Sequence, residues 1–347
     1  MKLSVQRRTL RLASALETSY GAVREREILS VTLTDADGLS GYGEAAPLQA
    51  YDGVSVERVE RALEAYAPVL ESSREENGAQ LIDACRAVDD LPPAFASIDM
   101  ALWDRAGRRA GKPVAALLTD SPAQAVPVNA TLSALDRAGA ATEAAAAAAA
   151  GFRCLKLKVG VGDDAGRVAA VRAAVGPEID LRLDANGAWN VEQAVRAIEL
   201  LSPAGLELVE EPTHGLEAVR AVRERVAVRV AIDETAAEHG ALGAGVADAV
   251  CLKISRCGGI SGLIAAATLV RASGAEVYVA STLDGPLGVA AALHAAAALA
   301  SRGVGGSSIL PCGLATLALF EDLENPLPAR NGRIALPTAS GLGVDPL

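Results

Sequence analysis

Aromatic residues and an excess of positive charge are what this 347-residue sequence lacks. Phe, Trp and Tyr together make up 3% of the chain, whereas hydrophobic residues as a whole make up 51%. We therefore expect a large core of alanine, valine and leucine, whose small side chains let helices pack closely. The formal net charge is −11, which argues against a nucleic-acid partner, because binding to phosphates favours basic surfaces.

The sequence also lacks a cysteine framework and a membrane-spanning run. Its five cysteines are odd in number and show no CxxC or metal-ligand spacing, so we expect free thiols in a reducing cytoplasm. The first 21 residues are charged and alternating, without the apolar centre of a signal peptide. The alanine run 144–150 lies between Glu143 and Arg153 and is typical of a water-soluble helix, so no membrane contact is expected.

Residues 1–125 predict a mixed α+β domain. Residues 27–45 contain two strand-like runs around a turn at Asp35–Gly38, which is the pattern of a hairpin. Helical patterns follow at 56–70 and 92–111.

From residue 126 onward, short strand-like runs alternate with alanine-rich helical runs. Eight such runs, roughly 25 residues apart, predict a (β/α)₈ TIM-type barrel. A doubly wound open sheet is the alternative, but no glycine-rich phosphate loop follows the first run. The last residues, 332–346, are strand- and turn-like and are expected to return to the N-terminal domain. The expected barrel strands are 126–131, 153–159, 179–185, 206–211, 228–233, 248–255, 275–282 and 307–313.

Three carboxylates stand at the predicted carboxyl ends of three successive strands, namely Asp184, Glu210 and Asp233. Neighbouring strands lie about 5 Å apart, so these side chains are predicted to converge on one cation. Oxygen ligands select a hard ion, and Mg²⁺ fits because it needs few protein ligands, with Mn²⁺ as the alternative. Any one of these acids taken alone would be interpreted as a helix cap or a loop residue.

Lys156 and Lys158 share one face of an apolar strand-like run, and Lys253 lies in another. Two like charges in a half-buried strand are unfavourable unless anions face them. A carboxylate site and an anionic substrate would supply those anions, whereas a wet sheet edge is the alternative for the lysine pair alone. We therefore expect all three lysines at the same site as the carboxylates, with a lysine acting as the base.

Four further polar residues follow these strands. Asn186, Glu211 and Glu234 stand next to or near the predicted ligands and are candidates for supporting or substrate contacts. Asp284 follows the seventh strand, where it either contacts substrate or organises the turn and the next helix. The three histidines show no ligand spacing and are expected to have surface or packing roles.

The motifs KLKVG, RLDANGAW, VEEP, IDET and LKISRCGGI, in this order, resemble the enolase superfamily. The resemblance is to its mandelate racemase/muconate lactonizing enzyme-like subgroup, and it covers almost the whole chain. GYGEAAP and ASIDMALWDRAGRRAGKPV resemble the capping domain of that subgroup. The resemblance implies a capping domain at 1–125, completed by 317–347, and a modified (β/α)₈ barrel at 126–316.

The resemblance also implies residue roles. The three carboxylates would bind Mg²⁺, which would stabilise the enediolate formed when the α-proton of a substrate carboxylate leaves. Lys158 and Lys253 would be the acid/base pair on opposite faces of the substrate, and Lys156 would support Lys158. Loops near Tyr20 and Tyr51 would close over a small carboxylate substrate.

Members of this subgroup share α-proton removal and then racemise, epimerise, cycloisomerise or dehydrate. Dipeptide epimerases have an Asp-x-Asp pair after strand eight, whereas this chain has LPCGLATLAL there. VPVNATL and CGLATLALFEDL resemble actinobacterial o-succinylbenzoate synthases, so a dehydration of that kind is the leading expectation. SRCGGI resembles cycloisomerases, so muconate-type cycloisomerisation stays an alternative, as does racemisation or epimerisation of an amino-acid derivative.

A non-catalytic barrel that only binds a carboxylate ligand is disfavoured, because all three carboxylates and both catalytic lysines are present. The sequence leaves the oligomeric state open, with a homo-oligomer as one alternative.

Overall fold

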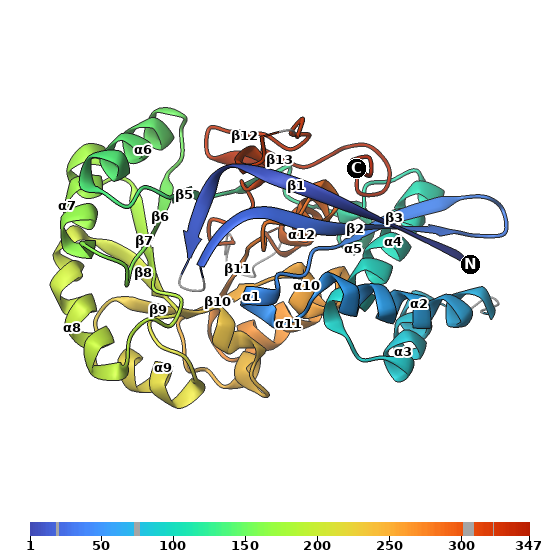
Figure 1. Ribbon diagram of the computed structural model, residues 1–347, viewed down its shortest axis with the longest axis horizontal. Coiled ribbons are helices and arrows are strands. Elements are labelled where there is room, and N and C mark those ends of the chain that lie inside the picture. The colour runs from blue at the N-terminus through green and yellow to red at the C-terminus, as the bar shows by residue number, and fades with distance from the viewer. Residues whose placement is uncertain (19–20, 73–76, 301–308, 322) are drawn as a thin grey trace.

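The structure is a computed structural model that describes residues 1–18, 21–72, 77–300, 309–321 and 323–347. Figure 1 shows a curled parallel sheet with helices around its outside, and beside it an antiparallel sheet that carries its own helices. Within the described ranges no helix is long and apolar enough to cross a bilayer. All five cysteines are free thiols.

The barrel sheet has seven parallel strands in the order β11-β10-β9-β8-β7-β6-β5. Val128 forms an isolated bridge to Cys312, and Ala280 forms one to Gly313. Cys312 and Gly313 thereby close the ring between its first and last strands. The expected TIM-type fold is confirmed, although its eighth strand consists of these two bridges in the described part of 307–313. The strands are β5 (Ala130–Leu132), β6 (Cys154–Lys158), β7 (Asp180–Asp184), β8 (Leu206–Glu210), β9 (Arg229–Ile232), β10 (Ala249–Leu252) and β11 (Glu276–Val279).

The first expected barrel strand, 126–131, is divided between two sheets. β4 (Ala125–Pro127) pairs with β13 (Arg333–Ala335) outside the barrel, and only the residues after it join the parallel sheet as β5. Pro127 has no backbone N–H to donate to a neighbouring strand, which suits an edge position.

Helices cover the outside of the barrel and bury the outward faces of its strands. Leu155 and Leu157 of β6 belong to the hydrophobic core, whereas Lys156 and Lys158 alternate to the other face. Between β9 and β10 the chain forms only the short turns η2 (Glu234–Ala237) and η3 (Ala241–Gly243). The helices are α6 (Arg137–Ala149), α7 (Asp164–Val175), α8 (Val191–Leu201), α9 (Leu216–Arg223), α10 (Ile254–Cys257), α11 (Ile260–Ala272) and α12 (Pro286–Ala300).

The capping domain is a three-stranded antiparallel sheet backed by helices. The turn expected at Asp35–Gly38 joins β2 to β3, and β1 adds a long edge strand. Gly43 lets α4 lie directly on β3, because a Cβ there would stand 1.9 Å from the carbonyl oxygen of Ser97. The elements are β1 (Lys2–Thr18), β2 (Gly21–Thr34), β3 (Ser40–Ala45), α1 (Gln49–Asp52), α2 (Val56–Ser72), α3 (Gly78–Val88), α4 (Pro92–Ala110) and α5 (Ala115–Leu118).

The end of the chain returns to the capping domain. After η4 (Leu317–Leu319) and β12 (Ala329–Arg330), Gly341 exchanges backbone hydrogen bonds with Lys112 and Val114, and the N–H of Leu342 donates to Asp104. The β1–β2 hairpin extends across the barrel from the same domain (Figure 1). The domain limits at residues 125 and 316 stay a prediction.

Glu44, at the end of β3, is buried where the capping domain meets the barrel. Its Oε1 accepts the N–H of Gly285 at 2.7 Å, just before α12 begins, while its Oε2 has no hydrogen-bond partner among the described residues. Burial, followed by the charge of Asp284, raises the pKa of Glu44 to about 8. This contact between the domains therefore favours a protonated carboxyl group.

We predict that Glu44 makes stability fall as pH rises. The folded protein binds this proton more tightly than the unfolded chain, so the stabilisation is complete below pH 4.5 and is lost as pH rises through 8. When the pH rises from about 6 to about 8, the free energy of unfolding of the parent protein should therefore fall by about 2 kcal/mol relative to that of Glu44→Gln. Urea unfolding at both pH values measures this, with Glu64→Gln on the exposed face of α2 as control. Parallel pH profiles for Glu44→Gln and the parent protein would contradict it.

Candidate active site

The parallel register brings the predicted site residues to one end of the sheet. Lys158 pairs with Asp184, and Asp184 pairs with Glu210, so these three stand at one level across β6, β7 and β8. Asp233 and Lys253 directly follow β9 and β10. All five lie at the carboxyl ends of the strands, where parallel barrels form their active sites.

The three carboxylates are almost completely buried, with 1%, 0% and 3% of Asp184, Glu210 and Asp233 exposed. Each contacts a lysine. Lys156 Nζ lies 2.8 Å from Asp184 Oδ2 and 2.8 Å from both carboxylate oxygens of Glu210. Lys158 Nζ donates to Asp184 Oδ2 at 2.7 Å, and Lys253 Nζ donates to Asp233 Oδ2 at 2.6 Å.

Burial and charge act against each other in this cluster. Burial alone would raise the pKa of Asp184, but the ammonium groups of Lys156 and Lys158 outweigh it and lower that pKa. The pKa of Asp233 is lowered in the same way, mainly by Lys253. Glu210 differs, because burial together with the charges of Asp184 and Asp233 raises its pKa despite Lys156. At Glu210, burial together with the neighbouring carboxylates therefore outweighs the attraction of Lys156.

The donor set fits a hard divalent cation. Within the described chain, ligand atoms of Glu210, Asp233 and Cys251 lie within 4.8 Å of one another. Asp184 is not in that group, and its Oδ2 contacts both Lys156 and Lys158. Burial raises the pKa of the Cys251 thiol well above its usual value, so it stays protonated and is a poor ligand for a hard ion. The carboxylate oxygens of Asp184, Glu210 and Asp233 remain as the set that suits such an ion.

Asn186 and Glu211 hold the turns that follow β7 and β8. Both have a positive φ, 43° and 41°. The side chain of Asn186 accepts from Lys158 Nζ at 2.5 Å and donates to Glu234 Oε1 at 3.0 Å. Glu211 accepts the N–H groups of Asp233 and Thr235 and thereby positions the loop that carries Asp233.

Glu234 lies beside the carboxylates with an unpaired oxygen. Its Oε2 is buried without a hydrogen-bond partner in the described chain. Burial, followed by the charges of Asp233 and Asp184, raises the pKa of Glu234 to about 7. A buried oxygen without a donor is a further sign that this end of the barrel suits a cation.

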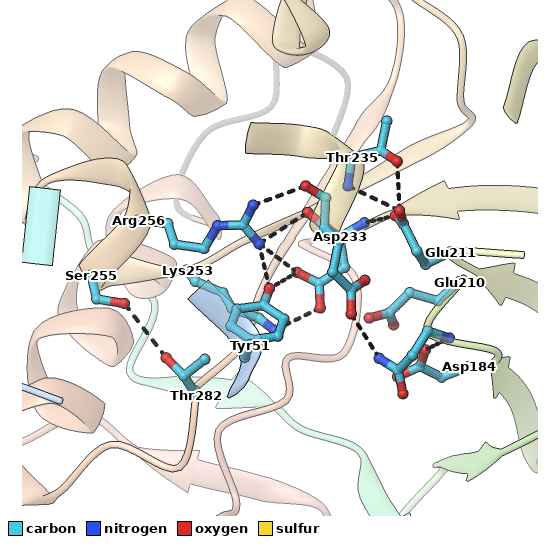
Figure 2. Close-up of polar contacts among 12 residues, drawn as sticks. Tyr51, Asp184, Glu210, Glu211, Asp233, Thr235, Lys253, Ser255, Arg256 and Thr282 are labelled. Carbon is cyan, nitrogen blue, oxygen red and sulfur yellow. Dashed lines mark hydrogen bonds and ion pairs between the residues drawn. The ribbon is translucent and has the colours of Figure 1, made fainter. Parts of the chain in front are cut away.

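Tyr51 reaches the cluster from the capping domain (Figure 2). Its hydroxyl donates to Asp233 Oδ1 at 2.7 Å, and its ring centre lies 4.3 Å from Lys253 Nζ. Arg256 also contacts this hydroxyl and donates to the carbonyl of Glu234 at 2.9 Å. Arg256 was missed in the sequence, where its position three residues after Lys253 was the available signal. The predicted contact Tyr20 lies outside the described residues.

A cavity of about 90 Å³ lies between the capping domain and the barrel mouth and is lined by Lys156, Lys158 and Lys253. From the capping domain, Leu16, Val23, Leu48 and Tyr51 line it. The other described lining residues are Asn129, Thr131, Asp184, Asn186, Asp233, Ala280, Ser281, Thr282, Leu283, Gly313, Thr316 and Leu319. A larger hollow, of about 900 Å³, lies between η2, η3 and α11. It is lined by Lys253 but by neither Lys156 nor Lys158, so the smaller cavity is the candidate active site.

Asp284 is not among the residues that line this cavity. Its carboxylate contacts the N–H of Thr282 at 3.4 Å and the hydroxyl of Thr282 at 3.2 Å. Its backbone N–H donates to Ser281 Oγ at 2.9 Å. The geometry favours the organisation of the turn before α12 over contact with a substrate.

Two family profiles match the chain. Residues 2–119 match the mandelate racemase/muconate lactonizing enzyme N-terminal domain, and residues 139–347 match the enolase C-terminal domain-like family. Muconate cycloisomerase 1 of Rhodococcus opacus is 31% identical over 92% of this chain and 88% of its own length. The o-succinylbenzoate synthase of Thermobifida fusca is 40% identical over 56% of this chain and 61% of its own length.

The fold is likewise shared with a solved structure. The dipeptide epimerase of Enterococcus faecalis, complexed with Mg and the dipeptide L-Leu-L-Tyr, is 27% identical with a TM-score of 0.88. The superposition covers 99% of this chain and 98% of that one.

We predict that Asp184→Asn weakens Mg²⁺ binding by about 100-fold or more, because it removes one buried anionic ligand. Isothermal titration of Mg²⁺ measures the change. Asp180→Asn is the matched control, since Asp180 lies on the same strand, β7, at its exposed opposite end. Equal Mg²⁺ affinity in the two variants would remove Asp184 from the ligand set.

Proposed function

The chain belongs to the mandelate racemase/muconate lactonizing enzyme group of the enolase superfamily, and from this premise we propose that it removes the α-proton of a small carboxylate substrate with the aid of Mg²⁺. Its relatives are enzymes, and a lyase or isomerase activity fits the chain. Mn²⁺ is the alternative ion, because the same oxygen ligands suit it.

One observation carries the proposal. Lys158 and Lys253 stand four strands apart in the sheet, on either side of three buried carboxylates, and both line the cavity under the capping domain. A substrate held between them would present one face to each ammonium or amine group. This is the arrangement that a proton transfer at an α-carbon requires.

The protein's own residues divide the work. Asp184, Glu210 and Asp233 would hold the ion, which when bound supplies positive charge beside a substrate carboxylate that gains negative charge as the α-proton leaves. Burial would lower the pKa of Lys156, but the charges of Asp184 and Glu210 outweigh it and raise that pKa. Lys156 therefore stays cationic and suits an electrostatic role.

The positions of Lys158 and Lys253 on either side of the carboxylates suit them for proton transfer. Burial would lower the pKa of Lys253, but the charge of Asp233 outweighs it and raises that pKa, so Lys253 starts as an ammonium group and suits the role of proton donor. Asp184 and Asn186 orient Lys158 Nζ. The carboxylate of Asp233 and the ring of Tyr51 orient Lys253 Nζ. In a dehydration only one lysine needs to remove the α-proton, and the ammonium so formed can return it to the departing hydroxyl, so that water leaves.

Within this chemistry, an o-succinylbenzoate synthase-like dehydration is the leading proposal. The similarity to the Thermobifida fusca synthase and the lack of an acidic pair in residues 309–316 support it. Muconate-type cycloisomerisation is supported by the Rhodococcus opacus relative, and racemisation or epimerisation of an amino-acid derivative by the epimerase structure.

Hydrogen–deuterium exchange in D₂O tests the proposal without presuming a product. A library of α-carboxylates is incubated with the protein and Mg²⁺, and exchange at the α-carbon is followed by NMR. We expect exchange with at least one compound and its loss after EDTA treatment. Mg²⁺-dependent ligand binding without exchange in any compound would instead favour a non-catalytic carboxylate-binding barrel.

Lys158→Ala and Lys253→Ala should each lower kcat/KM by about a thousandfold or more, because each removes a group positioned for proton transfer. The fold should be retained, as circular dichroism can check. Lys112→Ala serves as control, since Lys112 is an exposed lysine away from the cavity. Near-normal rates for Lys253→Ala on every active substrate would place that lysine outside the reaction.

Free dipeptides should be poorer substrates than dicarboxylates or N-acylated amino acids. A substrate ammonium group needs a nearby carboxylate, and the carboxylates lining the cavity, Asp184 and Asp233, are already paired with lysines. The measurement compares kcat/KM for free dipeptides, N-succinyl amino acids, muconate and the o-succinylbenzoate precursor. A preference for free dipeptides that disappears in Asp284→Asn would reverse this ranking.

A further inference from the structure

The barrel closes at Gly313, and this closure brings Asn129 and Ser281 to the cavity wall. Asn129 donates its backbone N–H to Cys312, and Ser281 donates its backbone N–H to Gly313. A Cβ on Gly313 would stand 3.0 Å from the Cβ of Ala280 and 3.7 Å from Asn129 Oδ1. Glycine therefore fits this position, where a larger residue would press against Ala280.

The side-chain amide of Asn129 has an unused donor. The residue is 3% exposed and lines the cavity. Its Nδ2 is buried and has no hydrogen-bond partner among the residues described. A buried amide without a partner is unfavourable, and an acceptor oxygen on a ligand would satisfy it.

The hydroxyl of Ser281 is constrained to donate. Its Oγ accepts the N–H of Asp284 at 2.9 Å and the hydroxyl of Thr316 at 3.0 Å. These two bonds use both acceptor sites of the oxygen, so the hydroxyl proton is the part left to interact. Both Ser281 and Thr316 line the cavity.

The charges around this wall also favour an acceptor ligand. Three lysines line the cavity, and its two lining carboxylates, Asp184 and Asp233, are paired with lysines. The nearby carboxylate of Asp284 is directed to Thr282. The cavity therefore offers donors and positive charge, and neither of the carboxylates that line it in the described part of the chain is free to pair with a ligand cation.

We infer that Asn129 and Ser281 form a specificity subsite for a second oxygen acceptor of the substrate, a carboxylate placed away from the reacting α-carbon. This inference rests on the proposed function, since it assumes that the α-carboxylate lies at the carboxylate–lysine cluster. Asn129 and Ser281 act on binding and not on proton transfer. The subsite selects substrates with a distal anionic group over those with a distal ammonium group.

Three ligands of one skeleton test the subsite. N-succinyl-L-leucine, N-butanoyl-L-leucine and N-(β-alanyl)-L-leucine place a carboxylate, a methyl group and an ammonium group on the same acyl chain. Calorimetry in Mg²⁺ buffer measures each Kd without requiring turnover. We expect the N-succinyl compound to bind at least tenfold more tightly than the N-butanoyl compound, and the N-(β-alanyl) compound to bind most weakly.

Variants assign the selectivity to residues. Asn129→Ala and Ser281→Ala should each raise the Kd of N-succinyl-L-leucine about tenfold and leave the Kd of N-butanoyl-L-leucine unchanged. Asn129→Asp keeps the shape of the side chain. It should weaken binding of the N-succinyl compound and strengthen binding of the N-(β-alanyl) compound. Asn77→Asp is the control, because it makes the same change at the exposed N-cap of α3, where aspartate caps equally well.

Three outcomes would overturn the subsite. In the parent protein, the N-(β-alanyl) ligand could bind as tightly as the N-succinyl ligand or more tightly, or none of the three ligands could bind. In the variants, the Kd values of all three ligands could rise equally. A failure of the proposed function looks different. In that case N-succinyl-L-leucine would bind with the expected dependence on Asn129 and Ser281, but α-carboxylates would show no exchange in D₂O.

Discussion

The burial of three carboxylates beside three lysines at the barrel mouth is the constraint on which the rest of the structure depends. Neither set could be buried alone, because uncompensated charge is costly in a low-dielectric interior. Lys156 bridges Asp184 and Glu210, and Lys253 pairs with Asp233. The parallel register supplies this balance, since it places the ends of β6, β7 and β8 at one level.

The capping domain completes this balance from outside the barrel. Tyr51 contributes a hydroxyl to Asp233 and a ring face to Lys253, so closure of the cap and placement of a predicted ligand are linked. Glu44 provides a second link at the start of α12, where a neutral carboxyl group is favoured. The first link therefore joins Tyr51 to charged groups of the candidate site, and the second is a hydrogen bond to a buried, neutral carboxyl group.

The wall opposite these ionic groups is neutral. Asn129 and Ser281 offer hydrogen-bond donors beside Gly313, Thr316 donates its hydroxyl to Ser281, and the cap contributes leucine and valine side chains. The cavity therefore has a charged side suited to proton transfer and a neutral side suited to recognition. This separation places recognition of the distal part of a ligand apart from the charged groups.

The sequence by itself determined the barrel, its capping domain and the positions of Asp184, Glu210, Asp233 and the lysines, because strand periodicity and strand ends are local properties that recur along the chain. Their roles as ligands and bases stay predictions. Only the tertiary structure decided that Asp284 lies off the cavity, that the described part of the expected eighth strand is reduced to bridges at Cys312 and Gly313, and that Asn129 and Ser281 line one cavity. These features depend on irregular backbone and on segments distant in the sequence, where no sequence period predicts them.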